Sequence, residues 1–293
     1  MSNTNHHESL VSTQWVADHL ADPDTRVAEV VWGEGAAWGV AAYRSGHIPG
    51  AAAWDFAAEL QDPARNAIVD QAGLEALLSR SGVAPTTTVV VYSGLSNLLA
   101  TFAFWLLKVY GHRDVRLLDG DRGKWLAEGR PLSGETPAFA PTRYLAQSYN
   151  ERLRAHRDDV LRAIGQPGVL LVDARSPQMF SGADQAGAAR GGHIPGAINL
   201  AARRETHADG SFRAWRTPTV REDGTFLPVA ELQALCRGLG IGPERAIITY
   251  CVRGGLSTHA WFVLTQLLGY PDVREYERSW VEWGNQEDTP IAQ

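Results

Sequence analysis

The stretch Gly46-His-Ile-Pro-Gly-Ala51 recurs as Gly192-His-Ile-Pro-Gly-Ala197, an offset of 146 residues in a chain of 293. Such a long offset is that of a whole domain, because the units of solenoid proteins repeat every ~20–50 residues. The length of the chain also suits two domains of ordinary size. The repeat therefore predicts one domain that has been copied once.

Later landmarks repeat with a larger offset. Tyr110-Gly-His-Arg-Asp-Val115 matches Leu268-Gly-Tyr-Pro-Asp-Val273, and Trp125 matches Trp283, both at an offset of 158 residues. The second copy therefore carries an insertion, and the polar stretch 203–224 is the expected place for it.

Each copy alternates short apolar runs with segments of helical periodicity. This alternation predicts an α/β fold in which each domain is a mainly parallel sheet flanked by helices on both faces. We expect an inactive first domain over residues 1–130, a proline-containing linker over 131–150 and a catalytic second domain over 151–293. The expected elements of the second copy are strands at 169–173, 197–200, 246–250 and 273–276, and helices at 229–239 and 257–268.

Cys251 stands where one of these strands ends, in Ile247-Ile-Thr-Tyr-Cys251-Val-Arg-Gly-Gly-Leu-Ser257. A glycine-containing loop follows the cysteine, and a helix follows the loop. Ligands of parallel sheets bind at such carboxyl ends of strands. Loop N–H groups and the positive end of a helix favour a thiolate, which is the reactive form of cysteine. The pattern predicts a sulfur nucleophile in an anion-binding loop.

The repeat supplies an internal control, because the 158-residue offset places Ser93 opposite Cys251. The first copy thus lacks the thiol, and features that both copies share are expected to be structural. The two GHIPGA segments are interpreted as turns, with His47 and His193 as structural hydrogen-bonding residues.

Composition excludes several classes of partner. The net charge of −6 argues against nucleic acid or an anionic membrane as the main partner. No apolar run approaches the ~20 residues of a membrane span, and the polar start of the chain lacks the features of a signal peptide. We expect a cytoplasmic protein without a metal or an organic cofactor. Cys236 is expected to be a small buried apolar residue, with no disulfide to Cys251.

Taken together, the doubled α/β pattern, the two GHIPGA turns and the single Cys-x5-Ser loop resemble the tandem rhodaneses, the thiosulfate and 3-mercaptopyruvate sulfurtransferases. Asp173-Ala-Arg175 and Ser279-Trp-Val-Glu-Trp283 belong to the resemblance, which runs from about Trp15 to Pro290. Leu60-Gln-Asp-Pro63 and Leu117-Leu-Asp-Gly120 are most similar to the bacterial thiosulfate sulfurtransferase branch.

The resemblance implies two rhodanese domains, an inactive first one and a site between them. Cys251 would take sulfur from a donor as a persulfide and pass it to a thiophile such as cyanide, a thiol or a protein acceptor. Backbone N–H groups of residues 252–257, from Val252 to Ser257, would surround the persulfide. Gly254 and Gly255 would let the loop curl, and Leu256 would form an apolar wall. We expect Ser257 to cap the helix, with a contact to the sulfur as the alternative.

Arg253 indicates the donor. A guanidinium at the rim of the loop matches the oxygens of thiosulfate and of the leaving sulfite. The resembling thiosulfate enzymes place a cation at this position, whereas the mercaptopyruvate enzymes place a serine there. The sequence therefore favours thiosulfate, with mercaptopyruvate as the alternative.

Other residues are assigned supporting roles. Asp173 and Arg175 are expected to tie the active loop to the sheet through an ion pair. Trp32 either lines the pocket or is an ordinary core aromatic, whereas Trp280 and Trp283 are expected to be core.

Three departures from the family pattern stand out. Met179 occupies the place of a substrate-binding arginine, for which Arg190 or a cation in 203–221 would have to substitute. Arg278 replaces a turn glycine, and Glu29 stands in the first copy where the second has Asp173.

Two rival classes are less well supported. A cysteine phosphatase uses Cys-x5-Arg, but Ser257 stands six residues after Cys251. A non-catalytic rhodanese module would be expected to lack the cysteine that this chain keeps.

Overall fold

The structure is a computed structural model. It describes residues 9–33, 39–62, 64–65, 67–94, 96–206, 208–210 and 212–293. For residues 212–214 it describes the backbone but not the side chains. Residues 1–8, on which the expectation about targeting rests, lie outside the described part of the chain. So does Pro63, the last residue of the motif Leu60-Gln-Asp-Pro63.

The chain divides into two compact units. The first comprises residues up to Asn150 together with the short segment Glu222–Phe226, and the second comprises Glu151–Arg221 and Leu227–Gln293. The predicted linker over 131–150 contains no helix and lies within the first unit. There, the main chains of Ser133 and His47 exchange two hydrogen bonds of 2.9 Å.

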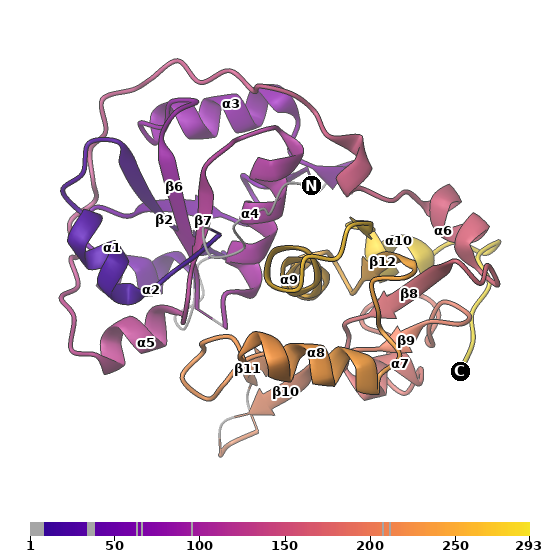
Figure 1. Ribbon diagram of the computed structural model, residues 1–293. Helices are drawn as coiled ribbons and strands as arrows, with labels where there is room; N and C mark the ends of the chain where they lie inside the picture. Colours follow the sequence, from indigo (N-terminus) through magenta and orange to yellow (C-terminus); the bar gives the residue numbers. More distant parts are fainter. Residues whose placement is uncertain are drawn as a thin grey trace. The chain divides into compact units, whose positions relative to one another are not determined.

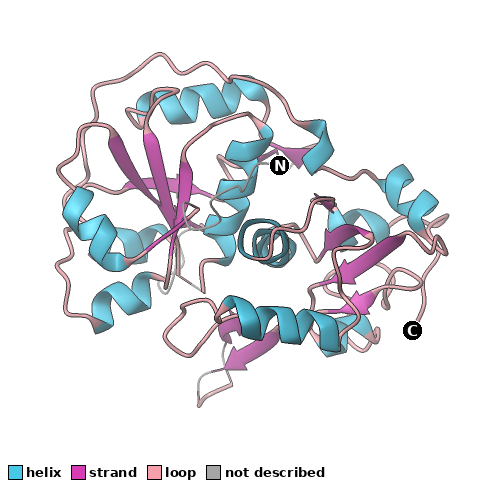
Figure 2. Cartoon of the chain, viewed as in Figure 1, coloured by secondary structure: helices cyan, strands magenta, loops and turns pink. Residues whose placement is uncertain are grey.

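The first unit is built on a parallel five-stranded sheet in the order β1-β7-β6-β2-β3. Helices flank this sheet (Figures 1 and 2). Its strands are β1 (Leu10–Val11), β2 (Thr25–Val31), β3 (Ala52–Asp55), β6 (Thr88–Tyr92) and β7 (Val115–Leu118), with a small antiparallel pair of β4 (Gln61–Asp62) and β5 (Ala67–Ile68). Its helices are α1 (Thr13–His19), α2 (Val40–Ser45), α3 (Gln71–Arg80), α4 (Leu98–Val109) and α5 (Arg122–Ala127).

The second unit is built on a parallel four-stranded sheet in the order β13-β12-β8-β9. The strands are β8 (Val169–Asp173), β9 (Ile198–Asn199), β12 (Ala246–Tyr250) and β13 (Val273–Glu275). The helices are α6 (Arg157–Ala163), α7 (Pro177–Phe180), α8 (Val229–Gly238), α9 (Gly255–Phe262) and α10 (Ser279–Trp283), with a short 3₁₀ turn η1 (Glu151–Leu153) and a π-helical turn η2 (Val263–Leu267) that continues α9. Both sheets confirm the predicted fold class.

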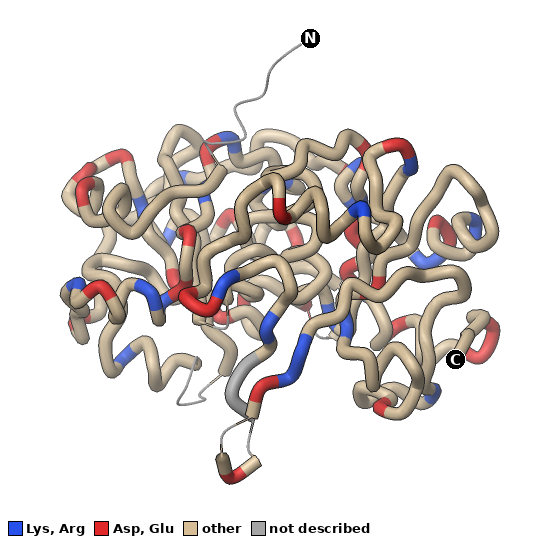
Figure 3. The backbone as a smooth tube through the Cα atoms, turned by 60° about the horizontal axis from the view of Figure 1, so that its bottom comes forward, with Lys and Arg blue, Asp and Glu red and all other residues tan. Residues whose placement is uncertain are grey.

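The predicted insertion corresponds to an antiparallel hairpin of β10 (Arg203–Thr206) and β11 (Phe212–Arg216). The first unit has a shorter pair, β4 and β5, after its third strand. The insertion has therefore lengthened an existing hairpin. Acidic and basic residues are mixed along the chain, including this hairpin (Figure 3).

The repeated landmarks form the same contacts in both units. His47 Nδ1 lies 2.9 Å from the carbonyl oxygen of Tyr43, and His193 Nδ1 lies 2.9 Å from that of Phe180. Each imidazole also stacks on the ring of its partner, at centroid distances of 3.9 and 3.7 Å. The two histidines are structural, as predicted.

The repeated tryptophans are also structural. Trp125 and Trp283 are completely buried, and their indole N–H groups donate to the carbonyl oxygens of Pro131 and Pro290 at 2.8 and 2.9 Å. Trp280 is completely buried too, which confirms its expected place in the core.

Candidate active site

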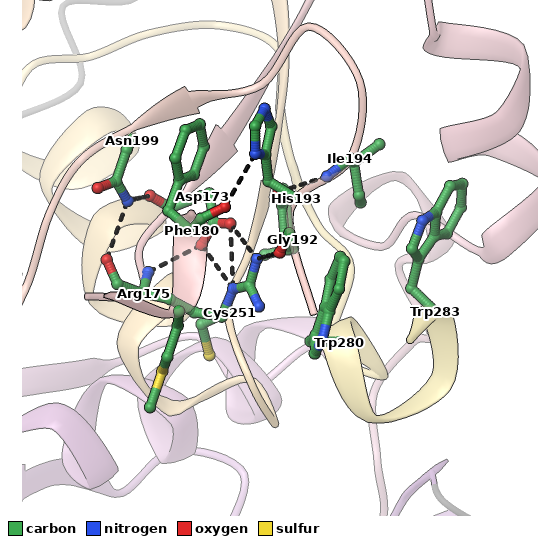
Figure 4. Close-up of polar contacts among 12 residues, drawn as sticks. Asp173, Arg175, Phe180, Gly192, His193, Ile194, Asn199, Cys251, Trp280 and Trp283 are labelled. Atoms are coloured by element: carbon green, nitrogen blue, oxygen red, sulfur yellow. Dashed lines mark hydrogen bonds and ion pairs between the residues drawn. The ribbon is translucent and has the colours of Figure 1, made fainter. Parts of the chain in front are cut away.

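Cys251 directly follows β12, whose neighbours in the parallel sheet are β8 and β13. Its main chain is fixed from the start of α10: Cys251 N–H donates to Ser279 Oγ at 3.0 Å, and Trp280 N–H donates to the carbonyl oxygen of Cys251 at 3.1 Å. The thiol is thus held at the carboxyl edge of the sheet, where the sequence placed it. Figure 4 draws the cysteine together with Asp173, Arg175 and the residues that contact them.

The loop after Cys251 directs N–H groups at the sulfur. Gly254 N–H donates to Cys251 Sγ at 3.2 Å, and the backbone N–H groups of Arg253 and Ser257 also favour the thiolate. Gly254 adopts left-handed backbone angles, φ 92° and ψ −28°, which favour glycine. Helix α9 begins at the next residue, so its N-terminal turn adjoins the sulfur.

Burial opposes this stabilisation of the thiolate. Cys251 is only 2% exposed, and burial, followed by the nearby Glu275 carboxylate, raises the pKa of its thiol. Hydrogen bonds from Ser257 and Arg253 act in the expected direction but do not offset the burial. The sequence-based expectation omitted this cost of removing a charged sulfur from water. Neither Cys251 nor Cys236 is in a disulfide, as expected.

Ser257 is not the helix cap that the sequence predicted. The N-cap of α9 is Gly254, and Ser257 lies three residues later, in the first turn. Its buried hydroxyl donates a hydrogen bond to Glu275 Oε1, lies 3.2 Å from the carbonyl oxygen of Gly254, and helps to lower the pKa of the Cys251 thiol. The earlier start of the helix turns this residue inward, toward the sulfur, which was the alternative interpretation.

Two residues of the site were missed by the sequence interpretation. Ser279, with a left-handed φ of 51°, supplies the hydroxyl that accepts from Cys251 N–H. Glu275 places a carboxyl group in the same buried cluster, hydrogen-bonded to Ser257 and Thr249. A signal for Glu275 was present in the sequence, because strand alternation puts it on the same face as the apolar Val273.

Asp173 and Arg175 form the expected ion pair, but its role differs. The guanidinium donates to both oxygens of Asp173, at 3.0 Å from Nε and 2.6 Å from Nη2, and both side chains are completely buried. Nη2 also donates to the carbonyl oxygen of Gly192 at 2.7 Å, and the guanidinium lies 4.1 Å from the ring of Trp280. The pair therefore joins β8 to the GHIPGA turn (Figure 4).

The departures have local explanations. Met179 is buried, and the guanidinium of Arg190 donates to the carbonyl oxygens of Thr289 and Trp283, at 3.0 and 3.2 Å. Arg190 thus holds the C-terminal segment. Arg278 has ordinary helical angles, φ −70° and ψ −24°, so glycine is not required there.

The remaining predicted residues are four members of the active loop, which differ in exposure, and Trp32 of the first unit. Val252 is half-buried, Arg253 is exposed, Gly255 is half-buried and Leu256 is buried. In the first unit, Trp32 follows β2, is 39% exposed and lies 5.3 Å from the ring of Phe56. The interpretation of Trp32 as an ordinary core residue is therefore wrong.

The loop around Ser93 shows what the first unit has in place of this arrangement. Arg122 N–H donates to the carbonyl oxygen of Ser93 at 3.2 Å, as Trp280 N–H does to that of Cys251. Here, however, Ser96 N–H donates to the Asp121 carboxylate at 3.0 Å, and Ser93 N–H donates to Asn97 Oδ1 at 2.8 Å. Side chains of the first unit itself accept from these loop N–H groups.

Comparison with known proteins identifies the family. The sequence model described as "Rhodanese-like domain" matches residues 12–128 and 156–286. The chain belongs to the rhodanese family. Both matches fall on the two copies inferred from the repeat, so this is a tandem rhodanese, a member of a family of sulfurtransferases.

Several relatives match over almost the whole chain. "Sulfur carrier protein TtuD" of Thermus thermophilus is 42% identical, over 98% of this chain and 97% of its own. "Thiosulfate sulfurtransferase" of Corynebacterium glutamicum is 38% identical, over 98% of this chain and 91% of its own.

Among solved structures, the anaerobic ergothioneine biosynthesis enzyme of Chlorobium limicola matches with a TM-score of 0.85 at 23% identity. The match covers 100% of this chain and 72% of that one, and it shows a shared fold.

Among the described residues, no helix is long and apolar enough to cross a membrane. No group of three or more His, Cys, Asp or Glu side chains in that part of the chain could hold a metal ion.

Proposed function

We propose that this rhodanese moves sulfane sulfur from thiosulfate to a thiophilic acceptor through a persulfide on Cys251. The observation that carries the proposal is the N–H group of Gly254, which points at the buried sulfur from 3.2 Å beside the start of α9. An N–H group in that position stabilises negative charge on the thiolate and on the persulfide that replaces it.

In the first half-reaction, the Cys251 thiolate attacks the outer sulfur of thiosulfate. A new S–S bond forms, the bond between the two donor sulfurs breaks, and its electron pair leaves with sulfite. The persulfide carries the single negative charge that the thiolate carried before. Loop N–H groups that already face the sulfur need little rearrangement to accommodate it.

In the second half-reaction, a thiophile attacks the terminal sulfur of the persulfide. The S–S electron pair returns to Cys251, and the thiolate is regenerated. Two separate half-reactions on one nucleophile predict ping-pong kinetics. Cyanide would give thiocyanate, and a thiol would give a persulfide.

Arg253 supports thiosulfate as the donor. Its side chain is exposed, two residues after the nucleophile, where a guanidinium can bind the sulfonate oxygens of the donor. The name of the Corynebacterium relative also supports thiosulfate. The runner-up donor is 3-mercaptopyruvate, which has a carboxylate in place of the sulfonate.

The name of the Thermus relative, a sulfur carrier protein, supports a protein or thiol acceptor in the cell. A cytoplasmic setting fits the two free cysteines, because thiols stay reduced there. The proposed sulfur transfer requires no cofactor with any of these donors and acceptors, because every bond that forms or breaks involves sulfur.

The donor is tested by measuring the rate of persulfide formation with thiosulfate and, separately, with 3-mercaptopyruvate. Arg253→Ser should lower kcat/KM for thiosulfate by about 10- to 100-fold, the equivalent of one charge-assisted hydrogen bond. The rate with mercaptopyruvate should change much less. Arg237→Ser, which removes the same charge from the exposed side of α8, is the matched control. An equal loss with both donors would remove the argument for thiosulfate.

A further inference from the structure

Glu275 is a carboxyl group that the reaction outlined above does not use. It lies on β13, is completely buried, and pairs in register with Thr249 of β12. Among the described residues, no lysine, arginine or histidine forms an ion pair with it. A buried carboxyl group without a cation is costly to keep ionised, so its environment calls for an explanation.

The Ser257 hydroxyl is hydrogen-bonded to Glu275, and it also helps to lower the pKa of the Cys251 thiol. Glu275 Oε1 is hydrogen-bonded to Ser257 Oγ, and Oε2 is hydrogen-bonded to Thr249 Oγ1. Ser257 lies in the first turn of α9, the helix that follows the Cys251 loop. Ser257 and Thr249 are completely buried, so their hydrogen bonds to Glu275 are shielded from solvent.

The Ser257 hydroxyl can point in either of two directions, because it has only one proton to donate. When Glu275 is ionised, Ser257 donates to the carboxylate and the sulfur keeps its own proton. When Glu275 is protonated, the carboxylic acid donates to Ser257, whose hydroxyl proton then turns to the thiolate. Thr249 can donate to the second carboxyl oxygen in both arrangements.

Few charged side chains among the described residues lie close to Glu275 in the sequence or the sheet. Glu277, two residues further on, is paired with Arg154, which flanks Glu275 through its backbone. Arg274 precedes Glu275 on β13, and its Nη1 lies 3.9 Å from Asp159 Oδ1. Arg253, in the loop, is the cation nearest to Cys251 in the sequence. Neither Arg154 nor Arg274 is paired with Glu275.

We propose that Glu275 is a positioning residue that takes the proton of the Cys251 thiol through the Ser257 hydroxyl and holds it while sulfur is transferred. The inference rests on the proposed function, because it assigns a base to that same nucleophile. It also explains how a buried thiol becomes reactive without a cation beside it.

The proton balance is closed. The thiol proton passes to Ser257 as the Ser257 proton passes to Glu275, which leaves a thiolate and a neutral carboxylic acid. The thiolate then displaces sulfite from thiosulfate, and the persulfide retains one negative charge. Attack by the acceptor returns the electron pair to Cys251. Glu275 remains protonated throughout, so the site carries one negative charge at every stage.

The pKa shifts of the two acids agree with this sharing. Burial is the main cause that raises the pKa of Glu275 well above its usual range, with the Glu277 charge as a further cause. Burial, followed by the Glu275 charge, raises the pKa of Cys251. Two acids coupled in this way titrate as a pair, and the first proton lost belongs to both.

The test is the pH dependence of alkylation of Cys251 by iodoacetamide, followed by mass spectrometry on the peptide that contains it. The wild-type rate should rise in two steps, as expected for a coupled pair. Glu275→Gln should leave a single step and lower the rate at neutral pH by about 10²-fold, as expected for loss of a base.

An alkylation rate that does not fall in Glu275→Gln would overturn the proposal. If Glu275 only repels the thiolate, Glu275→Gln makes the thiol more acidic, and alkylation at neutral pH is as fast as in the wild type or faster. Retention of both steps in the variant would also contradict the proposal, because the second titrating group would then be another residue.

Glu277→Gln is the matched control, since it removes a neighbouring buried carboxylate without touching the hydrogen-bond chain. It should keep both steps even where it lowers the melting temperature. Should Glu275→Gln fail to fold, Ser257→Ala provides the second test. It should slow alkylation at neutral pH to a similar extent, and an unchanged rate would contradict the relay through Ser257.

Alkylation does not depend on the sulfur donor, so it separates this inference from the proposed function. A two-step profile that requires Glu275, in a protein that thiosulfate does not load, would contradict the function alone. Loading by thiosulfate together with an alkylation rate insensitive to Glu275→Gln would contradict the inference alone.

Discussion

The loops after β6 and β12 occupy equivalent places in the two rhodanese units, yet their N–H groups donate to different acceptors. In the first loop, Asp121 and Asn97 accept from the N–H groups of Ser96 and Ser93. In the second, the residue equivalent to Asp121 is the neutral Ser279, and Gly254 N–H donates to the sulfur. The two loops therefore differ both in the thiol and in the groups that accept from their N–H groups.

The units also differ in how they build a shared ion pair. Arg175 donates to Asp173 and to the carbonyl oxygen of Gly192, on the GHIPGA turn. In the first unit, Arg122 donates to Glu29 and to the carbonyl oxygen of Gly46, on the equivalent turn. The two arginines come from different elements, so the position of the guanidinium is kept while its origin in the chain has changed.

The largest expected effect comes from moving the nucleophile between the units. Cys251→Ala should lower thiocyanate formation from thiosulfate and cyanide by about 10³-fold or more, because the covalent intermediate is lost. Adding Ser93→Cys to this variant should not restore activity, since the first loop keeps Asp121 at its N–H group. Restored turnover in the double variant would show that a thiol alone is sufficient.

The second test places a carboxylate in the active loop. Ser279→Asp should raise the pKa of the Cys251 thiol by about one unit or more, as a like charge does, and slow persulfide formation at pH 7 about tenfold. The loss should diminish as the pH rises and the thiol ionises. Ser279→Asn is the control, because asparagine tolerates the left-handed backbone without adding charge. An equal loss in both variants would point to the lost hydroxyl rather than to the charge.

Sequence reasoning was most successful where the backbone decides the outcome. The strands Val169–Asp173 and Ala246–Tyr250 were predicted with their observed bounds, because each is a continuous apolar run at the centre of a parallel sheet. The position of Cys251 follows from the second of these strands.

Side-chain partners were harder to predict. The role of Ser257 depends on where α9 begins, and a helix that begins at Gly255 turns this residue inward. The hydrogen-bond partners of Glu275 and Arg122 are distant in the sequence, and no local pattern identifies these partners. Periodicity determines which face a residue occupies, but not which polar group it meets across the core.

A third test compares the two ion pairs. Arg175→Met leaves the Asp173 carboxylate buried without a partner and should lower the free energy of unfolding of the second unit by about 3–5 kcal/mol. Arg122→Met should cost the first unit less, because the Arg122 side chain is 12% exposed whereas that of Arg175 is completely buried. Urea denaturation of the full chain measures both losses. A greater loss for Arg122→Met would contradict the ranking.

The smallest expected effect concerns the segment Glu222–Phe226, which belongs to the first unit. Lys124 Nζ lies 3.1 Å from Asp223 Oδ2, and the hydrogen bond from Thr225, with a further one from Lys124, lowers the pKa of Asp223 to about 2. The pKa is depressed in the folded state, so the stabilisation is present above the unfolded pKa of about 4 and is lost as the pH falls toward 2.

Asp223→Asn should therefore lower the free energy of unfolding by less than about 1 kcal/mol at pH 7, since the side chain is 48% exposed. The difference from the wild type should vanish near pH 2. A difference that persists at that pH would have a cause other than the charge of Asp223.

The central claim is that sulfur is carried by the second unit alone, on Cys251. The most direct measurement is the mass of the full chain after incubation with thiosulfate, before and after cyanide, with the modified peptide identified. The account predicts a gain of one sulfur, about 32 Da, on the peptide that contains Cys251, removed by cyanide and absent in Cys251→Ala. A sulfur on the Cys236 peptide, or none on either peptide, would contradict the account.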